Sequence, residues 1–217
     1  MRSLSLSCNG ASPLNILCLG AHSDDIEIGC GGTILRLAQQ YPNCVFHWVV
    51  FSAIGSRAAE AQRAAALFTS MTTIQGPLLK DFQDGFMPFV GAEVKAVFEE
   101  LKQKVTPDLI FTNNREDAHQ DHRLLGQLTW NTFRDHLILE YEIPKYDGDL
   151  GRPNLFVPLD SEVCERKVGY IMEAFPSQHA RRWFQRDTFL SIMRLRGIEC
   201  NAPGGYAEAF YCRKAVL

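Results

Sequence analysis

The sequence has no hydrophobic run long enough to cross a membrane and no block of basic residues. A spanning helix needs roughly 18 apolar residues in a row, and no run approaches that length. The opening segment, MRSLSLSCNGASP, also lacks the apolar stretch that a secretion signal requires. Lysine and arginine number 22 against 25 acidic residues, which leaves a net charge of −3. We therefore expect a cytoplasmic protein with no membrane span and no nucleic-acid partner.

Cysteine pairs with CxxC spacing are absent, as are internal repeats, low-complexity segments and the GxSxG turn of serine hydrolases. With 217 residues, 46% of them hydrophobic, the chain can bury a core that needs no disulfides. We expect one domain over residues 1–217. The cysteines are odd in number and irregularly spaced, so we expect free buried thiols at Cys8, Cys18, Cys30, Cys44, Cys164, Cys200 and Cys212.

Short apolar runs alternate with helix-forming segments along the first two thirds of the sequence. The runs predict strands at 15–19, 45–51, 72–74, 108–112 and 136–142. The intervening segments predict helices at 26–40, 57–68, 91–105 and 119–133. This alternation predicts an α/β fold, with a Rossmann-like, open and mostly parallel sheet that carries helices on both faces. Ligands of such folds bind beyond the carboxyl ends of the strands.

The pattern changes from about residue 144, where a segment rich in turn formers, PKYDGDLGRP, predicts a loop at 144–153. We expect this part to supply a substrate-facing loop and closing elements, although a plain solvated connection would have the same composition. Ser161 is a plausible N-cap, and Gly197 a plausible C-cap. The closing elements are expected as a strand at 155–158, helices at 161–175 and 183–196, and a strand at 207–213.

The loop after the first predicted strand contains a histidine and two adjacent carboxylates. His22 and Asp25 are three residues apart, so a turn can direct both side chains at one point. Asp24 lies beside Asp25 and would project differently, toward a substrate. A simpler interpretation is that both aspartates favour a helix N-terminus. The glycines that follow, at 29, 31 and 32, also leave open a phosphate-binding turn, although their spacing is not GxGxxG.

The loop after the strand at 108–112 contains two further histidines. His119 and His122 share one face at a predicted helix start, and Asp121 between them can brace an imidazole. Two histidines and one carboxylate form a zinc set with a fourth position open to water. This assigns His22, Asp25 and His122 to the metal, with Asp24 as base and His119 as acid. Either loop alone would as readily be solvated, but both lie at strand ends.

These residues resemble the LmbE-like, or PIG-L, family of zinc-dependent N-deacetylases. The family motif His-Pro-Asp-Asp followed by Gly-Gly-Thr corresponds to 22–25 and 31–33, with Ser23 in place of the proline. Its His-x-Asp-His motif corresponds to 119–122, and Tyr-Ala-Glu-Ala-Phe at 206–210 is a weaker similarity. The resemblance implies the same metal ligands, Asp24 as base, His119 as acid or oxyanion stabiliser, and Asp121 as the residue that tunes His119.

The resemblance also implies a function, namely removal of an acetyl group from an N-acetylated amino sugar of the GlcNAc type. It implies zinc, or another divalent transition metal, as cofactor, a small-molecule amino sugar as partner, and a possible homo-oligomer. Arg57, in an Arg-x-x-Glu pattern with Glu60, would reach the substrate, or would form a surface pair on its helix. Two alternatives stay open: a zinc amidase for a thiol-sugar conjugate or a non-sugar N-acyl compound, and a non-catalytic Rossmann-type nucleotide-binding module.

Overall fold

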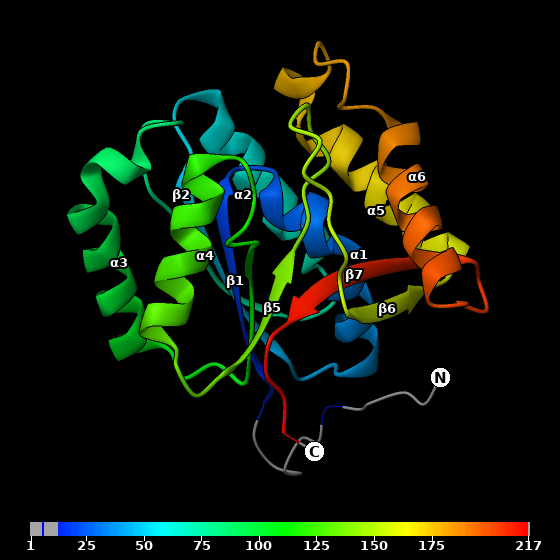
Figure 1. Cartoon of the computed structure of the whole chain (residues 1–217), viewed down its shortest axis with the longest axis horizontal. Helices are drawn as coiled ribbons and strands as arrows, with labels where there is room; N and C mark the ends of the chain where they lie inside the picture. Colours follow the sequence, from blue (N-terminus) through cyan, green and yellow to red (C-terminus); the bar gives the residue numbers. More distant parts are fainter. Residues whose placement is uncertain (1–5, 7–12, 217) are drawn as a thin grey trace.

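A seven-stranded sheet forms the middle layer of the protein in the computed structural model, which describes residue 6 and residues 13–216 (Figure 1). The strand order is β3-β2-β1-β4-β5-β7-β6. Strands β1 to β5 pair in parallel, and β7 pairs antiparallel with β5 and β6. The mostly parallel sheet expected from the sequence is therefore confirmed. Its strands are β1 (Asn15–His22), β2 (Val45–Ser52), β3 (Thr73–Leu79), β4 (Leu109–Asn113), β5 (Leu137–Tyr141), β6 (Leu155–Leu159) and β7 (Tyr206–Cys212).

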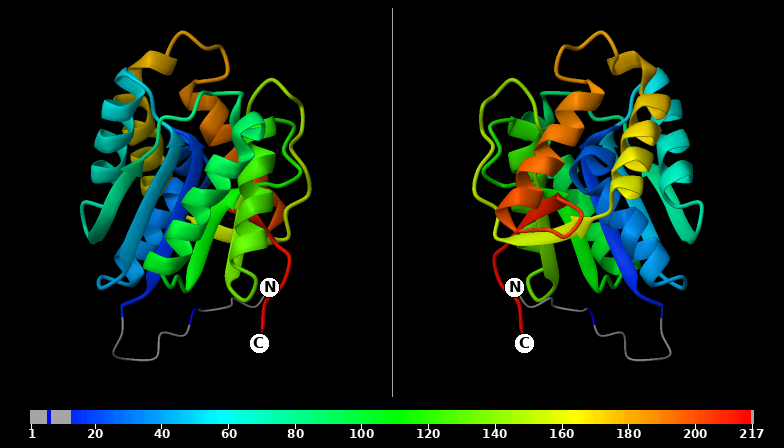
Figure 2. Two further views of the ribbon diagram at one scale, coloured as in Figure 1. Left: turned by 90° about the vertical axis from the view of Figure 1, so that its left-hand side faces the viewer. Right: turned by 90° about the vertical axis from the view of Figure 1, so that its right-hand side faces the viewer.

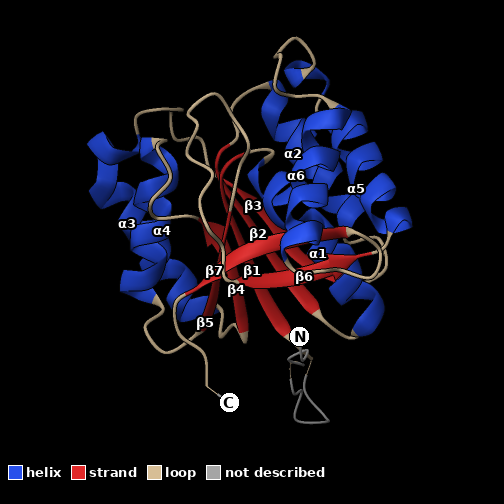
Figure 3. Ribbon diagram, turned by 45° about the vertical axis from the view of Figure 1, so that its right-hand side comes forward, coloured by secondary structure: helices blue, strands red, loops and turns tan. Residues whose placement is uncertain are grey.

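Helices cover both faces of this sheet (Figure 3). One face carries α1 (Asp25–Gln40), α2 (Ser56–Phe68), α5 (Ser161–Ala174) and α6 (Arg186–Glu199). The other carries α3 (Gly91–Lys104) and α4 (Gln120–Thr132). Two short 3-10 helices, η1 (Met87–Val90) and η2 (Pro176–Gln178), lie in the connections. The predicted Rossmann-like arrangement is thus confirmed, and no described helix is both long and apolar enough to cross a membrane.

The continuous apolar run of β1 is explained by the two helical layers. Side chains alternate between the faces of a strand. Ile16 and Cys18 enter the core under α1, α2 and α5, whereas Leu17 and Leu19 enter the core under α3 and α4. A strand that is buried on both faces has no polar side, so its sequence does not alternate.

Two of the predicted helix ends are wrong. Gly197 lies inside α6 rather than after it. Glycine is needed at this position because a Cβ atom would overlap the backbone of Gly205 and Tyr206. The residue in the left-handed conformation that follows the helix is Asn201, with φ of 51°. At the start of α5 the N-cap position belongs to Asp160 rather than to Ser161.

The six cysteines that the structure describes form no disulfide. Five of them are buried and Cys212 is half-buried, while Cys8 lies outside the described residues. Buried cysteines outside any disulfide are therefore found at five of the expected positions.

The connections that follow the parallel strands gather at one end of the sheet (Figure 2). The loop after β5 and the segment between α5 and α6 rise at this same end. The loops after β1 and β4, which contain the predicted site residues, open beneath them.

Candidate metal centre and catalytic cleft

The turn between β1 and α1 is closed by its own side chains. The backbone N–H of His22 donates to Oδ2 of Asp25 over 2.9 Å, which folds the turn back on itself. Asn113, the last residue of β4, donates from Nδ2 to the same oxygen over 3.0 Å, and its Oδ1 accepts from the N–H of Ala21. Asn113 was not among the predicted site residues, yet it joins the two loops that carry them.

His22, Asp25 and His122 converge on one point, as the sequence predicts. Nδ1 of His22 lies 3.1 Å from Nε2 of His122. Oδ2 of Asp25 lies 3.4 Å from Nε2 of His122 and 3.7 Å from Nδ1 of His22. Zinc bonds of about 2.0–2.1 Å at tetrahedral angles would place ligand atoms about 3.4 Å apart. The three side chains therefore fit a tetrahedral metal ion as a donor set of two nitrogens and one oxygen.

A carboxylate that sequence reasoning missed orients one of these ligands. Nδ1 of His122 donates to Oδ2 of Asp117 over 3.0 Å, which turns Nε2 toward the other two side chains as the nitrogen that would bind a metal. Oδ1 of Asp117 accepts from the N–H of His119 over 2.7 Å and lies 2.9 Å from Nζ of Lys145. The sequence offered one signal for Asp117, namely its place two residues before His119, the first histidine of the His-x-Asp-His motif.

Two further carboxylates lie against the opposite edge of His22. Nε2 of His22 is 3.2 Å from Oδ2 of Asp121 and 3.0 Å from Oδ1 of Asp84. The buried carboxylate of Asp121 also accepts from the N–H groups of Gly85 and Met87. It thus ties the loop before η1 to the site. Asp84 was another residue that the sequence did not single out.

His119 stands at the mouth of the site beside both ligand histidines. Its ring centroid lies 4.8 Å from that of His22 and 4.7 Å from that of His122. Its Nδ1 accepts the N–H of Asp121 over 3.3 Å, so the neutral ring carries its proton on Nε2. The carboxylate of Asp121 itself faces His22, and its charge acts on His119 across space.

Asp24, which is buried, and Arg57, which is half-buried, form an ion pair next to the ligands. Nη2 of Arg57 donates to Oδ1 of Asp24 over 2.7 Å, and its Nη1 donates to Glu60 over 3.1 Å. Glu60 in turn accepts from the N–H and hydroxyl of Ser177, which lies in η2, in the connection after α5. The predicted Arg57–Glu60 pair therefore exists, but Glu60 is buried and Arg57 is half-buried at the wall of the cleft, so the pair is not simply exposed on the helix.

The charges of the site shift its pKa values strongly. Burial lowers the pKa of His22, but the carboxylates of Asp121, Asp25 and Asp84 outweigh it and hold the pKa well above its usual range. For His122, burial is likewise outweighed by Asp25 and Asp117, and the pKa rises to about 9. Burial raises the pKa of Asp25, but the two histidines pull it well below its usual range. These groups form a cluster in which carboxylates and imidazoles stabilise each other's charged forms.

The pKa values of the predicted base, Asp24, and the predicted acid, His119, shift in the directions opposite to those of the neighbouring aspartate and histidines. Burial raises the pKa of Asp24, and the opposing charge of Arg57 does not fully compensate. Burial lowers the pKa of His119, and the nearby charges of His122 and His22 lower it further. Asp24 is thus a better proton acceptor than an exposed aspartate, and His119 is held in its neutral form near pH 7.

These residues lie at the floor of a cleft of about 490 Å³. The loop after β5 contributes Lys145, Tyr146 and Asp147 to the lining of this cleft. The connection between α5 and α6 contributes Gln178, Arg181 and Trp183, which sequence reasoning did not assign to the site. The cleft therefore has aromatic and polar walls above a floor of carboxylates and histidines.

Comparison with known proteins identifies the family. Residues 17–133 match the sequence profile of the PIG-L family, described as GlcNAc-PI de-N-acetylase. The match spans more than half of the chain and contains both loops of the site. The chain therefore belongs to the PIG-L family and is a deacetylase, a hydrolase that acts on amide bonds.

One sequence relative supports this assignment, and two solved structures have the same fold. The chain is 29% identical over 143 residues to the uncharacterized deacetylase YaiS of Escherichia coli K12, covering 59% of this chain and 74% of YaiS. The fold resembles the conserved protein TT1542 of Thermus thermophilus, with a TM-score of 0.75 at 19% identity, over 94% of this chain and 96% of that one. It also resembles the N,N'-diacetylchitobiose deacetylase of Pyrococcus horikoshii, with a TM-score of 0.67 at 19% identity, over 90% and 82%.

The same fold also carries a different reaction. The 4-carboxy-2-hydroxymuconate hydratase GalB of Pseudomonas putida KT2440 matches with a TM-score of 0.74 at 16% identity, over 94% of this chain and 98% of that one. The fold alone therefore does not determine the chemistry, which has to be argued from the site.

Proposed function

We propose that this deacetylase is a zinc-dependent hydrolase that removes the N-acetyl group from an N-acetylated amino sugar of the GlcNAc type and releases acetate. The observation that carries the proposal is the convergence of His22, Asp25 and His122 beside Asp24 and His119 at the floor of the cleft. The membership of the chain in a de-N-acetylase family supports the same reaction.

His22, Asp25 and His122 would hold the metal. A bound zinc ion supplies Lewis-acid polarisation of the acetamide carbonyl and a water that is nucleophilic at neutral pH. A set of two imidazoles and one carboxylate also suits other divalent transition metals, so the native ion is decided by availability as well as by the ligands.

Asp24 is proposed to be the general base. Its Oδ1 is held by Arg57, so Oδ2 is the atom that takes the proton from the attacking water. Burial raises the pKa of this carboxyl, which strengthens it as a base. Arg57 keeps the carboxylate in one orientation, a role that differs from the direct substrate contact that the family resemblance implies.

His119 is proposed to act on the carbonyl oxygen and the leaving nitrogen. Because its Nδ1 accepts a backbone N–H, its Nε2–H is the donor available to the oxyanion. To act as acid, His119 would first take up the proton that Asp24 removes from the water and then give it to the leaving amine, which restores the carboxylate of Asp24 and the neutral imidazole. Asp121, through its charge and its backbone N–H, sets the orientation of this ring.

The walls of the cleft are suited to a sugar. Trp183 and Tyr146 offer apolar ring faces for the C–H groups of a pyranose, and Asp147 and Gln178 offer acceptors and donors for its hydroxyls. Arg181 lines the same cleft and could contact an anionic substituent such as a phosphate. The substrate is accordingly proposed to be a small N-acetylhexosamine derivative.

The test is acetate release from a panel of N-acetylhexosamines, their 1-phosphates and their glycosides, with metal-stripped and zinc-restored protein side by side. We expect release only after zinc is restored. Release from non-sugar N-acyl compounds or thiol-sugar conjugates instead would favour the alternative amidase. Release that is equal with and without metal would refute the zinc mechanism.

The nucleotide-binding alternative is not supported by the place of the glycines. Gly29, Gly31 and Gly32 lie inside α1, where Cβ atoms would overlap Tyr141, Phe68 and the Leu159–Glu208 region respectively. They serve close packing of a helix and form no loop that could surround a phosphate.

A further inference from the structure

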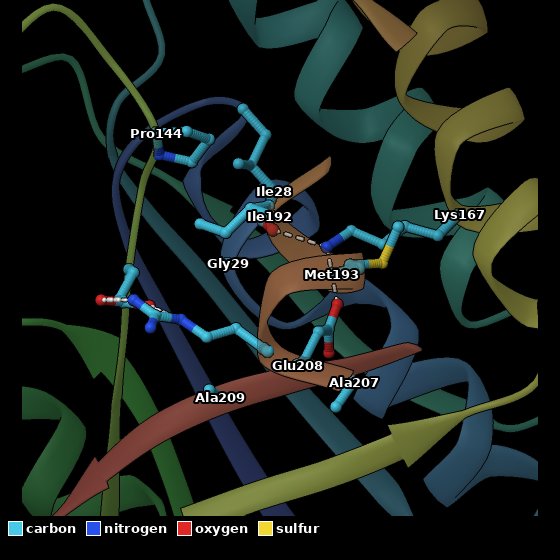
Figure 4. Close-up of a pocket in the computed structure, with 11 residues that line it drawn as sticks. Ile28, Gly29, Pro144, Lys167, Ile192, Met193, Ala207, Glu208 and Ala209 are labelled. Atoms are coloured by element: carbon cyan, nitrogen blue, oxygen red, sulfur yellow. Dashed lines mark hydrogen bonds and ion pairs between the residues drawn. The ribbon is translucent and has the colours of Figure 1, made fainter. Parts of the chain in front are cut away.

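A buried ion pair contacts the middle of the helix that begins with the catalytic aspartates. Lys167 of α5 and Glu208 of β7 are both buried, and Nζ of Lys167 lies 2.6 Å from Oε1 of Glu208. Lys167 also donates to the carbonyl oxygen of Ile28 over 2.6 Å. Figure 4 shows Lys167 directed at both partners, with α1 on one side and β7 on the other.

The carboxylate of Glu208 binds the same turn of α1 from below. Oε1 accepts the N–H of Gly32 over 2.8 Å, and Oε2 accepts the N–H of Thr33 over 2.6 Å. In a regular α-helix the N–H of residue 32 donates to the carbonyl of residue 28. Here the carbonyl of Ile28 has the Lys167 ammonium as a partner, and the N–H of Gly32 has the Glu208 carboxylate. The ion pair therefore bridges the two ends of one helical hydrogen bond.

The surroundings hold this arrangement tightly. A Cβ atom at position 32 would press on Leu159 and on the Glu208 carboxylate, so glycine is the residue that allows the approach. The neighbouring cavity has a volume of about 20 Å³, room for one water molecule. With so little solvent, the charges of Lys167 and Glu208 interact in a low-dielectric environment and strongly prefer this geometry.

We infer that Lys167 and Glu208 are positioning residues of the deacetylase site, which set the place of α1 along its axis and thereby the places of Asp24 and Asp25. Gly32 lies seven residues, about 10 Å of helix, beyond Asp25, so neither residue touches the substrate. The inference accounts for two sequence features that the catalytic roles leave unexplained, the Gly-Gly-Thr stretch and the Tyr-Ala-Glu-Ala-Phe segment. It rests on the proposed function for its activity readout.

The decisive variant is the double substitution Lys167→Met with Glu208→Leu. A buried ion pair that is replaced by apolar side chains of similar volume often costs little stability. The N–H groups of Gly32 and Thr33 would then lose the carboxylate, but they lie inside a continuous α-helix and keep carbonyl oxygens of their own helix within reach. If the pair positions α1, the double variant melts within a few degrees of wild type, yet binds zinc about tenfold more weakly and shows at least a tenfold lower kcat with little change in KM.

Zinc affinity is measured by competition with a chromophoric chelator, and kcat by acetate release at saturating zinc. The chelator assay needs no substrate, so its outcome stands even if the proposed substrate class is wrong. A double variant with wild-type zinc affinity and wild-type kcat overturns the inference. Rescue is tested with Lys167→Met combined with Glu208→Gln, because a glutamine oxygen can again accept the N–H of Gly32. We expect this variant to recover part of the zinc affinity, and recovery of none would also count against the inference.

A matched control comes from another buried ion pair on the same cavity. Nη2 of Arg196 lies 2.8 Å from Oε1 of Glu142, and neither residue contacts α1 through a hydrogen bond among the described residues. Arg196→Met should lower the melting temperature while the folded protein keeps its zinc affinity. If Arg196→Met weakens zinc binding as much as the Lys167 and Glu208 variants do, general destabilisation explains the effect and the positioning role is refuted.

Discussion

Replacement of Asp117 by asparagine should weaken zinc binding although Asp117 is not itself a proposed ligand. Its three neighbours are all donors: Nδ1–H of His122, the N–H of His119 and the ammonium of Lys145. A carboxylate accepts from all three, whereas an amide has one accepting oxygen and must turn its NH₂ group toward a donor in either orientation. If the NH₂ group faces His122, the imidazole is favoured in the tautomer with the proton on Nε2, the atom proposed to bind the metal.

The size of the effect follows from this loss of orientation. Removal of a carboxylate that orients a metal-binding histidine typically costs 10- to 100-fold in metal affinity, or about 1.4–2.7 kcal/mol. Asp117→Asn should therefore raise the zinc dissociation constant by that factor in a chelator competition assay. Acetate release should need correspondingly more zinc to reach half of its maximum, and saturating zinc should restore part of the turnover.

Asp149→Asn is the matched control. Oδ2 of Asp149 accepts from Lys145 over 2.6 Å and from the N–H of Ala118 over 2.7 Å, so it shares the neighbourhood of Asp117 but not the contact with His122. Zinc affinity should be unchanged in this variant. Equal zinc affinities for wild type and Asp117→Asn would refute the argument, and equal losses for both variants would trace the effect to the Lys145 loop instead.

Three further predictions use the same assays and thermal melts. His22→Ala should lose zinc and activity together, whereas Asp24→Asn should keep zinc and lose turnover on the order of 10²-fold or more, and normal turnover of Asp24→Asn would remove its assignment as base. Trp183→Ala should raise KM for an N-acetylhexosamine about 2- to 10-fold with a smaller change in kcat, and an unchanged KM would mean that the ring does not contact the sugar. Gly197→Ala should destabilise the protein by about 1–3 kcal/mol because its Cβ would overlap the backbone before β7. Gly169→Ala, in α5 with no atom near the new Cβ, should instead stabilise it by about 0.5–1 kcal/mol, and the opposite order of melting temperatures would contradict this account.

Much of the fold could be predicted from local sequence patterns. Every predicted strand and helix has a counterpart in the structure, because apolar runs of strand length and helix-forming segments alternate without ambiguity. The errors lie where local signals resemble each other. A glycine such as Gly197 is typical of a helix end, but here it lets α6 pack closely against the backbone of Gly205 and Tyr206. The strand predicted at 72–74 continues as β3 to Leu79 because it pairs with β2.

The convergence of the proposed metal ligands could also be predicted, because it follows from two short motifs at the carboxyl ends of adjacent parallel strands. His22 and Asp25 come from one turn, and His122 comes from the next loop of the sheet. The spacing within each motif sets which side chains share a face, and the parallel pairing of β1 with β4 brings the two motifs together.

Other features depend on contacts between distant parts of the chain. Glu208 meets Gly32 across 176 residues, and Arg57 meets Ser177 across 120. Local patterns mark Arg57 in Arg-x-x-Glu and Glu208 in Tyr-Ala-Glu-Ala-Phe, but they do not show what either charge pairs with, because burial and pairing are decided only when β7 and α5 pack against α1 and α2. The sequence by itself therefore determined the alternation of elements and the five side chains of the proposed reaction centre. The tertiary structure alone decided which charges become buried around them, because a charge is buried only where packing also supplies its partner.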